Sequence, residues 1–252
     1  MLSVDLNCDM GESFGTWRMG CDAELMKYIS SANVACGFHA GDARTMRMTI
    51  ELAVQNNVAI GAHPGYPDLQ GFGRRNMSMS VEEIHDIVLY QISALKGMCE
   101  AYGARLNHVK PHGALYNQAS GSREISLAIA EAVARADASL ILCGLSGSSL
   151  IDEAARIGLR TASEAFADRT YRPDGALTPR SEPNALILDV DAAASQAVGL
   201  VKSGTVMTTD GTVMAVKADT ICVHGDGENA VAFAAAIARA FGDNDIAIHH
   251  IS

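Results

Sequence analysis

Acidic and amide side chains alternate near the start of the chain. Asp5, Asn7 and Asp9 are two residues apart, and Glu12 follows closely. Alternate residues of a β-strand point to the same side, so an extended segment here would place the first three on one face. Carboxylates gathered with other ionisable groups perturb one another's pKa values, which acid–base chemistry uses. The segment therefore predicts a reactive site at the end of a first strand.

Histidines follow other short apolar runs at the points where those runs end. Five of the eight histidines do so, namely His39, His63, His108, His112 and His224. A single histidine of this kind is more often a satisfied buried side chain, but a core built only for stability would avoid the cost of burying so many. We expect a mouth that performs acid–base catalysis or binds a ligand. The residues expected to lead it are Asp9, His63, Lys110 and His112.

Other chemistries have less support in the sequence. No G-x-x-x-x-G-K-[ST] phosphate-binding loop occurs, and residues 144–148 (GLSGS) depart at the last position from the G-x-S-x-G pattern of serine hydrolases. The aspartates and histidines could also hold a divalent metal ion, but no H-E-x-x-H or other fixed ligand spacing points to one. Hydrolysis by acid–base catalysis, with or without a metal, is the reaction class that remains.

Seven apolar runs of the buried-strand kind alternate with segments of helical periodicity. The predicted strands are residues 3–7, 32–35, 58–62, 105–109, 140–143, 160–163 and 220–223. The predicted helices are residues 45–55, 80–102, 125–134, 150–156, 192–201 and 230–241, the second beginning with a Ser80–Glu83 capping box. Residues 206–216 predict a hairpin around Asp210 and Gly211. This alternation predicts an α/β fold with a parallel sheet, whose loops converge at the carboxyl ends of the strands.

Composition limits the class of protein further. The 252 residues suit one α/β barrel, and 48% of them are hydrophobic, so we expect a single domain over residues 1–252. A formal net charge of -10 would repel phosphate backbones and anionic lipid, which argues against nucleic-acid and membrane partners. None of the six cysteines forms a C-x-x-C pair, and no leader or long apolar span is evident. We expect a cytoplasmic protein with reduced thiols.

Four motifs, taken in chain order, resemble the LamB/YcsF family. They are residues 5–12 (DLNCDMGE), 33–42 (NVACGFHAGD), 61–68 (GAHPGYPD) and 108–117 (HVKPHGALYN). The likeness continues through residues 164–171 (EAFADRTY), 174–180 (DGALTPR) and 222–226 (CVHGD). It is specific and spans essentially the whole chain.

The resemblance implies an irregular seven-stranded (β/α) barrel related to glycoside hydrolase and polysaccharide deacetylase barrels. It also implies the activity of the A subunit of an ATP-dependent 5-oxoprolinase. Such a chain would work with subunits B and C to convert 5-oxo-L-proline, ATP and water to L-glutamate, ADP and phosphate. ATP is then expected as a co-substrate handled with the partners, and the need for a divalent metal stays open. As a hypothesis, the partners phosphorylate the lactam oxygen and this chain activates water against the ring.

We expect the small-molecule substrate to contact polar residues of these motifs. Arg74, Arg169 or Arg180 could hold a carboxylate or phosphoryl group, and Lys110 could steady developing oxyanion charge. The expected substrate-binding set is Asn7, Glu12, His39, Arg74, Asn117, Glu164, Arg169, Arg180 and His224.

Two other functions stay open. A metal-dependent deacetylase of N-acylated sugars would bind a stoichiometric Zn²⁺ or similar ion and act without ATP, although one Trp, six Tyr and six Phe offer little for a sugar platform. A non-catalytic subunit would bind oxoproline tightly, and the activity of its complex would tolerate loss of every acid and base at the mouth.

Overall fold

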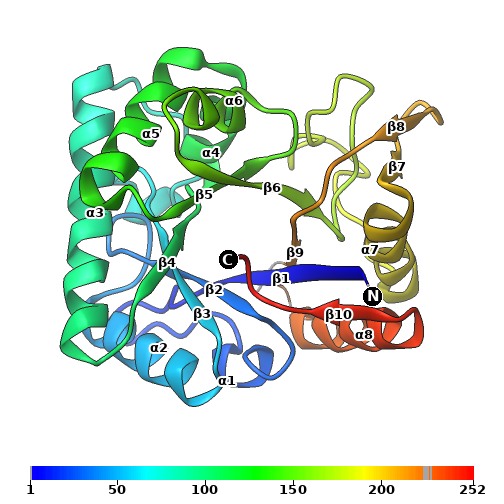
Figure 1. The fold of residues 1–252 in the computed structure, drawn as a ribbon, viewed down its shortest axis with the longest axis horizontal. Coiled ribbons are helices and arrows are strands. Elements are labelled where there is room, and N and C mark those ends of the chain that lie inside the picture. The colour runs from blue at the N-terminus through cyan, green and yellow to red at the C-terminus, as the bar shows by residue number, and fades with distance from the viewer. Residues whose placement is uncertain (1, 224–226, 228) are drawn as a thin grey trace.

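Seven parallel strands close into a barrel in the computed structural model, which describes residues 2–223, 227 and 229–252. The strands are β1 (Leu2–Met10), β2 (Ser31–Ala35), β3 (Ala59–His63), β4 (Leu106–Val109), β5 (Ile141–Leu145), β6 (Arg160–Phe166) and β9 (Thr220–Val223). They pair in this order, and β9 pairs back to β1. The predicted seven-stranded (β/α) barrel is therefore confirmed (Figure 1).

Helices surround the barrel (Figure 1). The longer ones are α2 (Ala43–Gln55), α3 (Val81–Ala101), α5 (Arg123–Asp137), α6 (Ser149–Arg156), α7 (Val190–Ser203) and α8 (Ala230–Asp243). All six match predicted helices, and the Ser80–Glu83 capping box closes reciprocally at the start of α3. Three short helices were not predicted, namely α1 (Asp22–Leu25), η1 (Leu69–Gly71) and α4 (Gly113–Gly121). Across the described part of the chain, no helix is both long and apolar enough to cross a membrane.

Two further pieces of β-structure decorate the barrel. The predicted hairpin is confirmed, with β7 (Thr205–Met207) antiparallel to β8 (Val213–Ala215). A short strand that was not predicted, β10 (Ile246–Ile248), pairs with the first residues of β1. The residues after β10 cross the barrel in Figure 1, and Ile251 packs against Ile141, Cys143 and Ala162. The end of the barrel opposite the carboxyl ends of the strands is thus covered by an apolar contact.

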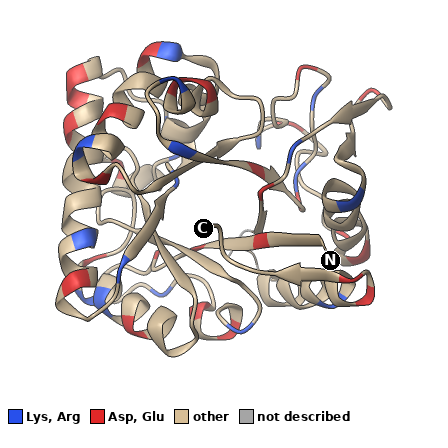
Figure 2. Ribbon diagram, viewed as in Figure 1, with Lys and Arg blue, Asp and Glu red and all other residues tan. Residues whose placement is uncertain are grey.

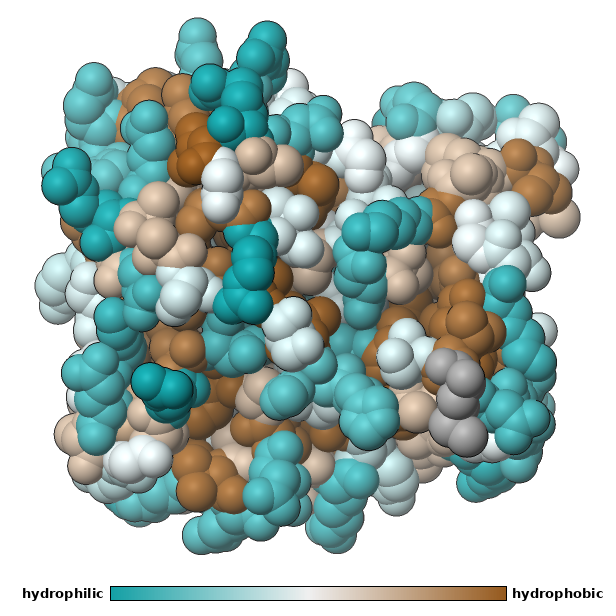
Figure 3. All heavy atoms as spheres, in the orientation of Figure 1, coloured by the Kyte–Doolittle hydropathy of each residue, from teal (hydrophilic) through white to brown (hydrophobic). Residues whose placement is uncertain are grey.

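Most of the apolar core lies between the strands and the helices, and a smaller apolar cluster of Ile141, Cys143 and Ala162 lies apart from it. On β1, Leu6, Cys8 and Met10 are fully buried in this core. Figure 2 places most acidic and basic residues on the outer helices and loops, and Figure 3 shows the same face as a mixture of hydrophilic and hydrophobic residues. The ionisable side chains inside the barrel gather on the inward faces of the strands.

Candidate active site at the barrel mouth

The inward face of β1 carries Asp5, Asn7 and Asp9, because the strand extends over its whole predicted length and beyond. Asp5 and Asn7 are almost fully buried. Asn7 donates to Glu164 Oε1 at 3.0 Å and to Thr220 Oγ1 at 2.6 Å, which ties β1 to β6 and β9. The three side chains form a polar column that rises toward the mouth and ends at Asp9.

Lys110, just after β4, lies at the centre of a buried ionic network. Its Nζ is 3.0 Å from Asp9 Oδ1, 2.8 Å from Glu164 Oε1, 3.2 Å from Asn7 Oδ1 and 3.1 Å from Cys222 Sγ. An ammonium has only three hydrogens to donate, so these contacts use its full capacity. Burial alone would lower the pKa of Lys110, but Asp9, Cys222 and Glu164 hold it well above its usual value. Lys110 therefore remains charged and compensates the carboxylates around it.

Asp9 is the most accessible member of that network. Its side chain is 14% exposed, compared with 4% for Lys110 and 0% for Glu164. Asn33 donates to Asp9 Oδ1 at 3.0 Å, and Asp9 Oδ2 lies 3.2 Å from His63 Nε2. Burial would raise the pKa of Asp9, but His63, whenever its ring is protonated, and the Lys110 ammonium hold it well below its usual range. Asp9 is an ionised carboxylate that a substrate could reach.

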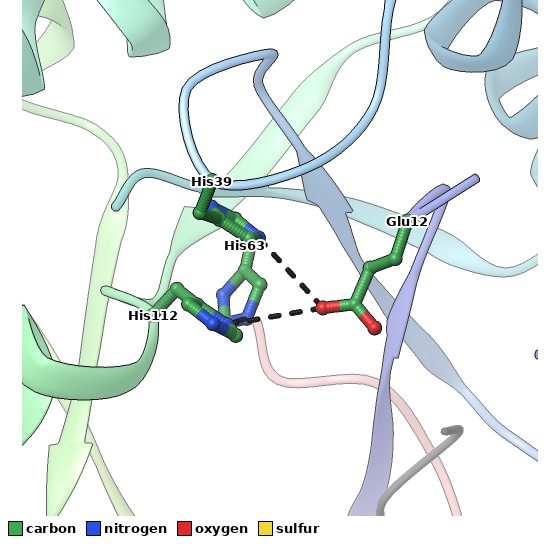
Figure 4. A group of neighbouring side chains, drawn as sticks. All are labelled: Glu12, His39, His63 and His112. Carbon is green, nitrogen blue, oxygen red and sulfur yellow. Dashed lines mark hydrogen bonds and ion pairs between the residues drawn. The ribbon is translucent and has the colours of Figure 1, made fainter. Parts of the chain in front are cut away.

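Three imidazoles and one carboxylate form a second group beside Asp9. His39 and His112 stack in parallel with ring centroids 3.8 Å apart, and His63 meets both rings edge-on. Glu12 points toward them from beyond the end of β1 (Figure 4). Its Oε1 lies 3.7 Å from His39 Nε2 and 3.8 Å from His112 Nδ1. The four side chains come from the ends of four neighbouring strands, β1 to β4.

Two backbone carbonyls fix how the imidazoles are protonated. The Lys110 carbonyl lies 2.7 Å from His63 Nδ1, and the Phe72 carbonyl lies 2.8 Å from His112 Nε2. A carbonyl oxygen can only accept a hydrogen bond, so each of these ring nitrogens carries the hydrogen. In the neutral rings His63 Nε2 and His112 Nδ1 then both present lone pairs, and they face each other at 2.9 Å.

The backbone around these rings leaves little free space. A Cβ at Gly65 would lie 2.6 Å from His39 Nδ1, and one at Gly73 would lie 2.8 Å from His112 Cδ2. Gly73 also has a φ of +63°, which L side chains rarely adopt. Burial lowers the pKa of His39 well below its usual value and that of His112 to about 3, helped in both by neighbouring histidines. These two rings are closely packed and in the neutral form.

The structure thus brings together the four residues predicted to lead catalysis, Asp9, His63, Lys110 and His112. Four of the predicted substrate-binding residues contact the same network, namely Asn7, Glu12, His39 and Glu164. Their catalytic and binding roles stay predictions. His224 lies outside the described residues.

The three predicted arginines have different surroundings. Arg74 is exposed with its guanidinium 4.9 Å from the Phe72 ring centroid, although its charge contributes to the lowered pKa of His39. Arg169 is buried and donates to the carbonyls of Ala185 and Thr178, so it holds the loop between β6 and α7 together. Arg180 is exposed on that loop. Of the three, Arg74 and Arg180 are the ones that solvent reaches.

Other members of the site were not predicted from the sequence. Tyr116 donates to Glu164 Oε2 at 2.6 Å, whereas the neighbouring Asn117, which was predicted to bind substrate, is exposed on α4. Asn33 bridges Asn7 and Asp9, and its own oxygen lies 2.9 Å from His108 Nε2. Asn33 had a usable signal, because it lies two residues after Ser31 in a strand whose alternate residues face inward. Tyr116 had none, since the helix that carries it was not predicted.

Comparison with known proteins agrees with this architecture. The 5-oxoprolinase A subunit of Bordetella parapertussis is 54% identical over 246 residues, which cover 98% of both chains. The crystal structure of a "Lactam Utilization Protein" from Thermus thermophilus superposes with a TM-score of 0.95 at 45% identity, covering 99% of this chain and 100% of that one. A family 4 carbohydrate esterase from Streptomyces lividans shares the fold alone, with a TM-score of 0.51 and 12% identity over 99% of this chain and 93% of that one. The model of the LamB/YcsF family matches residues 4–252, and the chain belongs to that family.

Proposed function

We propose that this chain is the A subunit of an ATP-dependent 5-oxoprolinase, which opens 5-oxo-L-proline to L-glutamate together with subunits B and C. The proposal rests on relatives that carry this name at 54% identity over 98% of the chain. The observation that carries it is the ionised Asp9 held at the mouth by Lys110 and Asn33. A site of this kind can move a proton to and from a reacting water.

The chemistry requires activation because a lactam is a resonance-stabilised amide. Transfer of the γ-phosphoryl group of ATP to the lactam oxygen converts the ring carbon into a better electrophile and releases ADP. Water then adds to that carbon, and the C–N bond breaks as the ring nitrogen leaves with a proton, which gives an acyl phosphate. A second water releases phosphate and leaves glutamate. We assign the phosphoryl transfer to the partner subunits, because the sequence has no P-loop.

We assign the proton transfers to Asp9. Its Oδ1 is held by Lys110 and Asn33, so Oδ2 is the atom placed to accept a proton from the attacking water. The protonated carboxyl group can then return that proton to the departing nitrogen. Lys110 is a positioning residue in this scheme, because it is buried beneath Asp9 and its hydrogens are committed. Arg74 and Arg180, both exposed, are the candidates for the substrate carboxylate or phosphoryl group.

The test is reconstitution. The purified chain is mixed with candidate subunits B and C, and glutamate formation from 5-oxoproline is followed with and without ATP. We expect glutamate only when all three chains and ATP are present, and Asp9→Asn should strongly reduce it. Glutamate formed at the same rate without this chain would refute the assignment. An unchanged rate with Asp9→Asn would instead favour a chain that binds oxoproline without catalysing its opening.

A further inference from the structure

We infer that Glu12, His39, His63 and His112 form a binding site for one divalent transition-metal ion of the Zn²⁺ class. Each residue offers one ligand atom, and these four atoms lie within 4.8 Å of one another. All four side chains are buried and converge from separate strand ends (Figure 4). Three nitrogen ligands and one carboxylate oxygen form a donor set that Zn²⁺ and its neighbours accept.

The hydrogen bonds of the rings point to a metal more directly. Metal-bound histidines nearly always donate their other ring N–H to a carbonyl or carboxylate, which aims the free lone pair at the ion. His63 and His112 both show this arrangement, with the Lys110 and Phe72 carbonyls as acceptors. The two lone pairs therefore converge on one point, and a cation there removes the repulsion between them.

The spacing of the ligand atoms agrees with this. Bonds of 2.0–2.1 Å in a tetrahedral site place ligand atoms about 3.3 Å apart. The separations here are 2.9 Å between His63 Nε2 and His112 Nδ1, 3.7 Å between Glu12 Oε1 and His39 Nε2, and 3.8 Å between Glu12 Oε1 and His112 Nδ1. These values lie on both sides of the expected one, but the His39 and His112 rings are parallel, so one of them must turn out of the stack before both nitrogens can reach the same ion.

His39 distinguishes a metal from a proton. A proton shared between His63 and His112, with Asp9 accepting from His63, would satisfy those two rings without any metal. It would do nothing for His39, whose two ring nitrogens have no hydrogen-bond partner among the described residues although the side chain is fully buried. Burial of such a polar group without a partner is costly, and coordination by Nε2 would remove part of that cost.

The local charge balance also favours a cation. The contacting side chains include three carboxylates, Asp9, Glu12 and Glu164, but one ammonium, Lys110. Over these four side chains, before the more distant charge of Arg74 is counted, two formal negative charges are in excess, and a divalent ion would offset them. The neutral imidazole is the form that binds metals. Mg²⁺ and Ca²⁺ prefer oxygen ligands, so they fit this set poorly.

An ion bound here would lower the pKa of a coordinated water. Asp9 is placed beside His63 to accept the proton from such a water, which is the role assigned to it above. The inference concerns the same site as the proposed function, but it stands without the substrate named there. A chain that binds the ion and fails to support 5-oxoproline opening would sink the proposed function and leave the metal site intact.

The experiment measures binding rather than turnover. The full chain is stripped with a chelator and titrated calorimetrically with ZnCl₂, CoCl₂ and MgCl₂, and the metal content is determined by elemental analysis after gel filtration. We expect one Zn²⁺ or Co²⁺ per chain, with dissociation constants below about 1 µM, and no comparable binding of Mg²⁺. Co²⁺ bound by nitrogen and oxygen ligands should also give visible absorption bands, and Zn²⁺ should raise the melting temperature.

Variants locate the ion. His39→Phe keeps the stacked ring but removes the nitrogen, and Glu12→Gln removes the charge, so each should weaken Zn²⁺ binding by at least about tenfold. His85→Ala removes an exposed histidine elsewhere, and Asp9→Asn leaves the four ligands intact, so both should keep one ion per chain. Circular dichroism verifies that each variant folds, and the Co²⁺ bands of the unaltered chain test the site without any substitution.

The inference is overturned if the stripped, folded chain binds no Zn²⁺ at micromolar concentration. It is equally overturned if His85→Ala abolishes binding, or if His39→Phe and Glu12→Gln, both folded, bind as tightly as the parent chain. Glutamate assays on the reconstituted complex run in parallel, so that a failed metal site and a failed substrate assignment give different results.

Discussion

Asp5 and Asp9 lie four residues apart on the same inward face of β1, yet their surroundings are opposite. Asp5 is held by hydroxyl groups: Ser30 and Ser31 donate to its Oδ1 at 2.6 and 2.7 Å, and Thr220 donates to its Oδ2 at 2.5 Å. Burial raises the pKa of Asp5, and these three hydrogen bonds only partly offset that effect. This carboxyl group joins β1, β2 and β9 in the lower half of the barrel.

Asp9, in contrast, contacts an ammonium and an imidazole and retains access to solvent. Its pKa is lowered where that of Asp5 is raised. The same residue type on one strand therefore serves architecture where its partners are hydroxyls, and is available for chemistry where its partner is a buried cation. The hydrogen-bond and ion-pair partners of Asp5 and Asp9, and their depth in the barrel, therefore distinguish the two aspartates.

The largest effect that separates the two aspartates should be on turnover. Asp9→Asn should reduce glutamate formation by the reconstituted complex about 10²- to 10⁴-fold, because the amide cannot accept the proton. Asp5→Asn, a matched change on the same face, should leave the turnover of folded protein within a few-fold of the parent. Steady-state rates, corrected for folded fraction by circular dichroism, measure both. Equal losses in the two variants would remove the distinction.

Removing the Lys110 ammonium should show how strongly the stability of the ionic network around Asp9 and Glu164 depends on it. Lys110→Met leaves Asp9 and Glu164 buried without their shared ammonium, so we expect a loss of about 3–5 kcal/mol in the free energy of unfolding. Denaturant titration measures this loss. Lys27→Met, which breaks an exposed ion pair with Glu24, is the control and should leave the midpoint nearly unchanged. A stable Lys110→Met chain would show that the carboxylates need no compensating charge.

Two substitutions at neighbouring positions of α4 test whether the buried hydrogen bond to Glu164 contributes to stability. Tyr116→Phe removes a buried donor to Glu164 and should cost about 1–3 kcal/mol of stability, since the acceptor loses its partner. Asn117→Ala, one residue away and exposed, should have little effect on unfolding. Thermal denaturation compares the two. A lowered turnover of Asn117→Ala without loss of stability would support the substrate contact predicted from the sequence.

The smallest expected effect is the pH dependence that Asp5 imparts. The pKa of Asp5 is higher in the folded chain than its ordinary value of 3.8, so the folded chain keeps the proton longer as pH rises. Stability should therefore fall as pH increases from about 4 through the raised pKa. Asp5→Asn should lack this fall. Denaturation midpoints of both proteins between pH 4 and 7 test it, and parallel profiles would contradict the assignment.

Much of the fold was predictable from the sequence because its strands are short, apolar and separated by helices with clear ends. Residues 220–223 were predicted with the same bounds as β9, and Ser80 starts α3 as its capping box indicated. β10 was missed because it has three residues and is stabilised by pairing with β1 rather than by its own pattern. α4 was missed because it is short and begins and ends at glycine.

The sequence allowed us to predict which residues lie at the carboxyl ends of the strands, but not how they contact one another. The alternation of side chains along a strand placed Asp5, Asn7 and Asp9 on one face, and closure of the barrel brought Lys110 to them. The separation of His63 from His112 by 2.9 Å, and the carbonyls that orient both rings, depend on backbone positions that no spacing encodes. Arg169 was expected at the substrate because it lies in a motif, and sequence spacing could not reveal that it also donates to two loop carbonyls.

β1 pairs with β10 along its first residues, with β9 along its middle and with β2 along its end. A strand bonded in this way has few routes to local opening, so its amide hydrogens should exchange with solvent only when the whole barrel unfolds. The backbone of Asp9 is part of this strand and should be equally protected. Any opening and closing during turnover must then come from the loops after the strands, which carry Glu12, His39 and Phe72, and deuterium uptake during turnover should concentrate there.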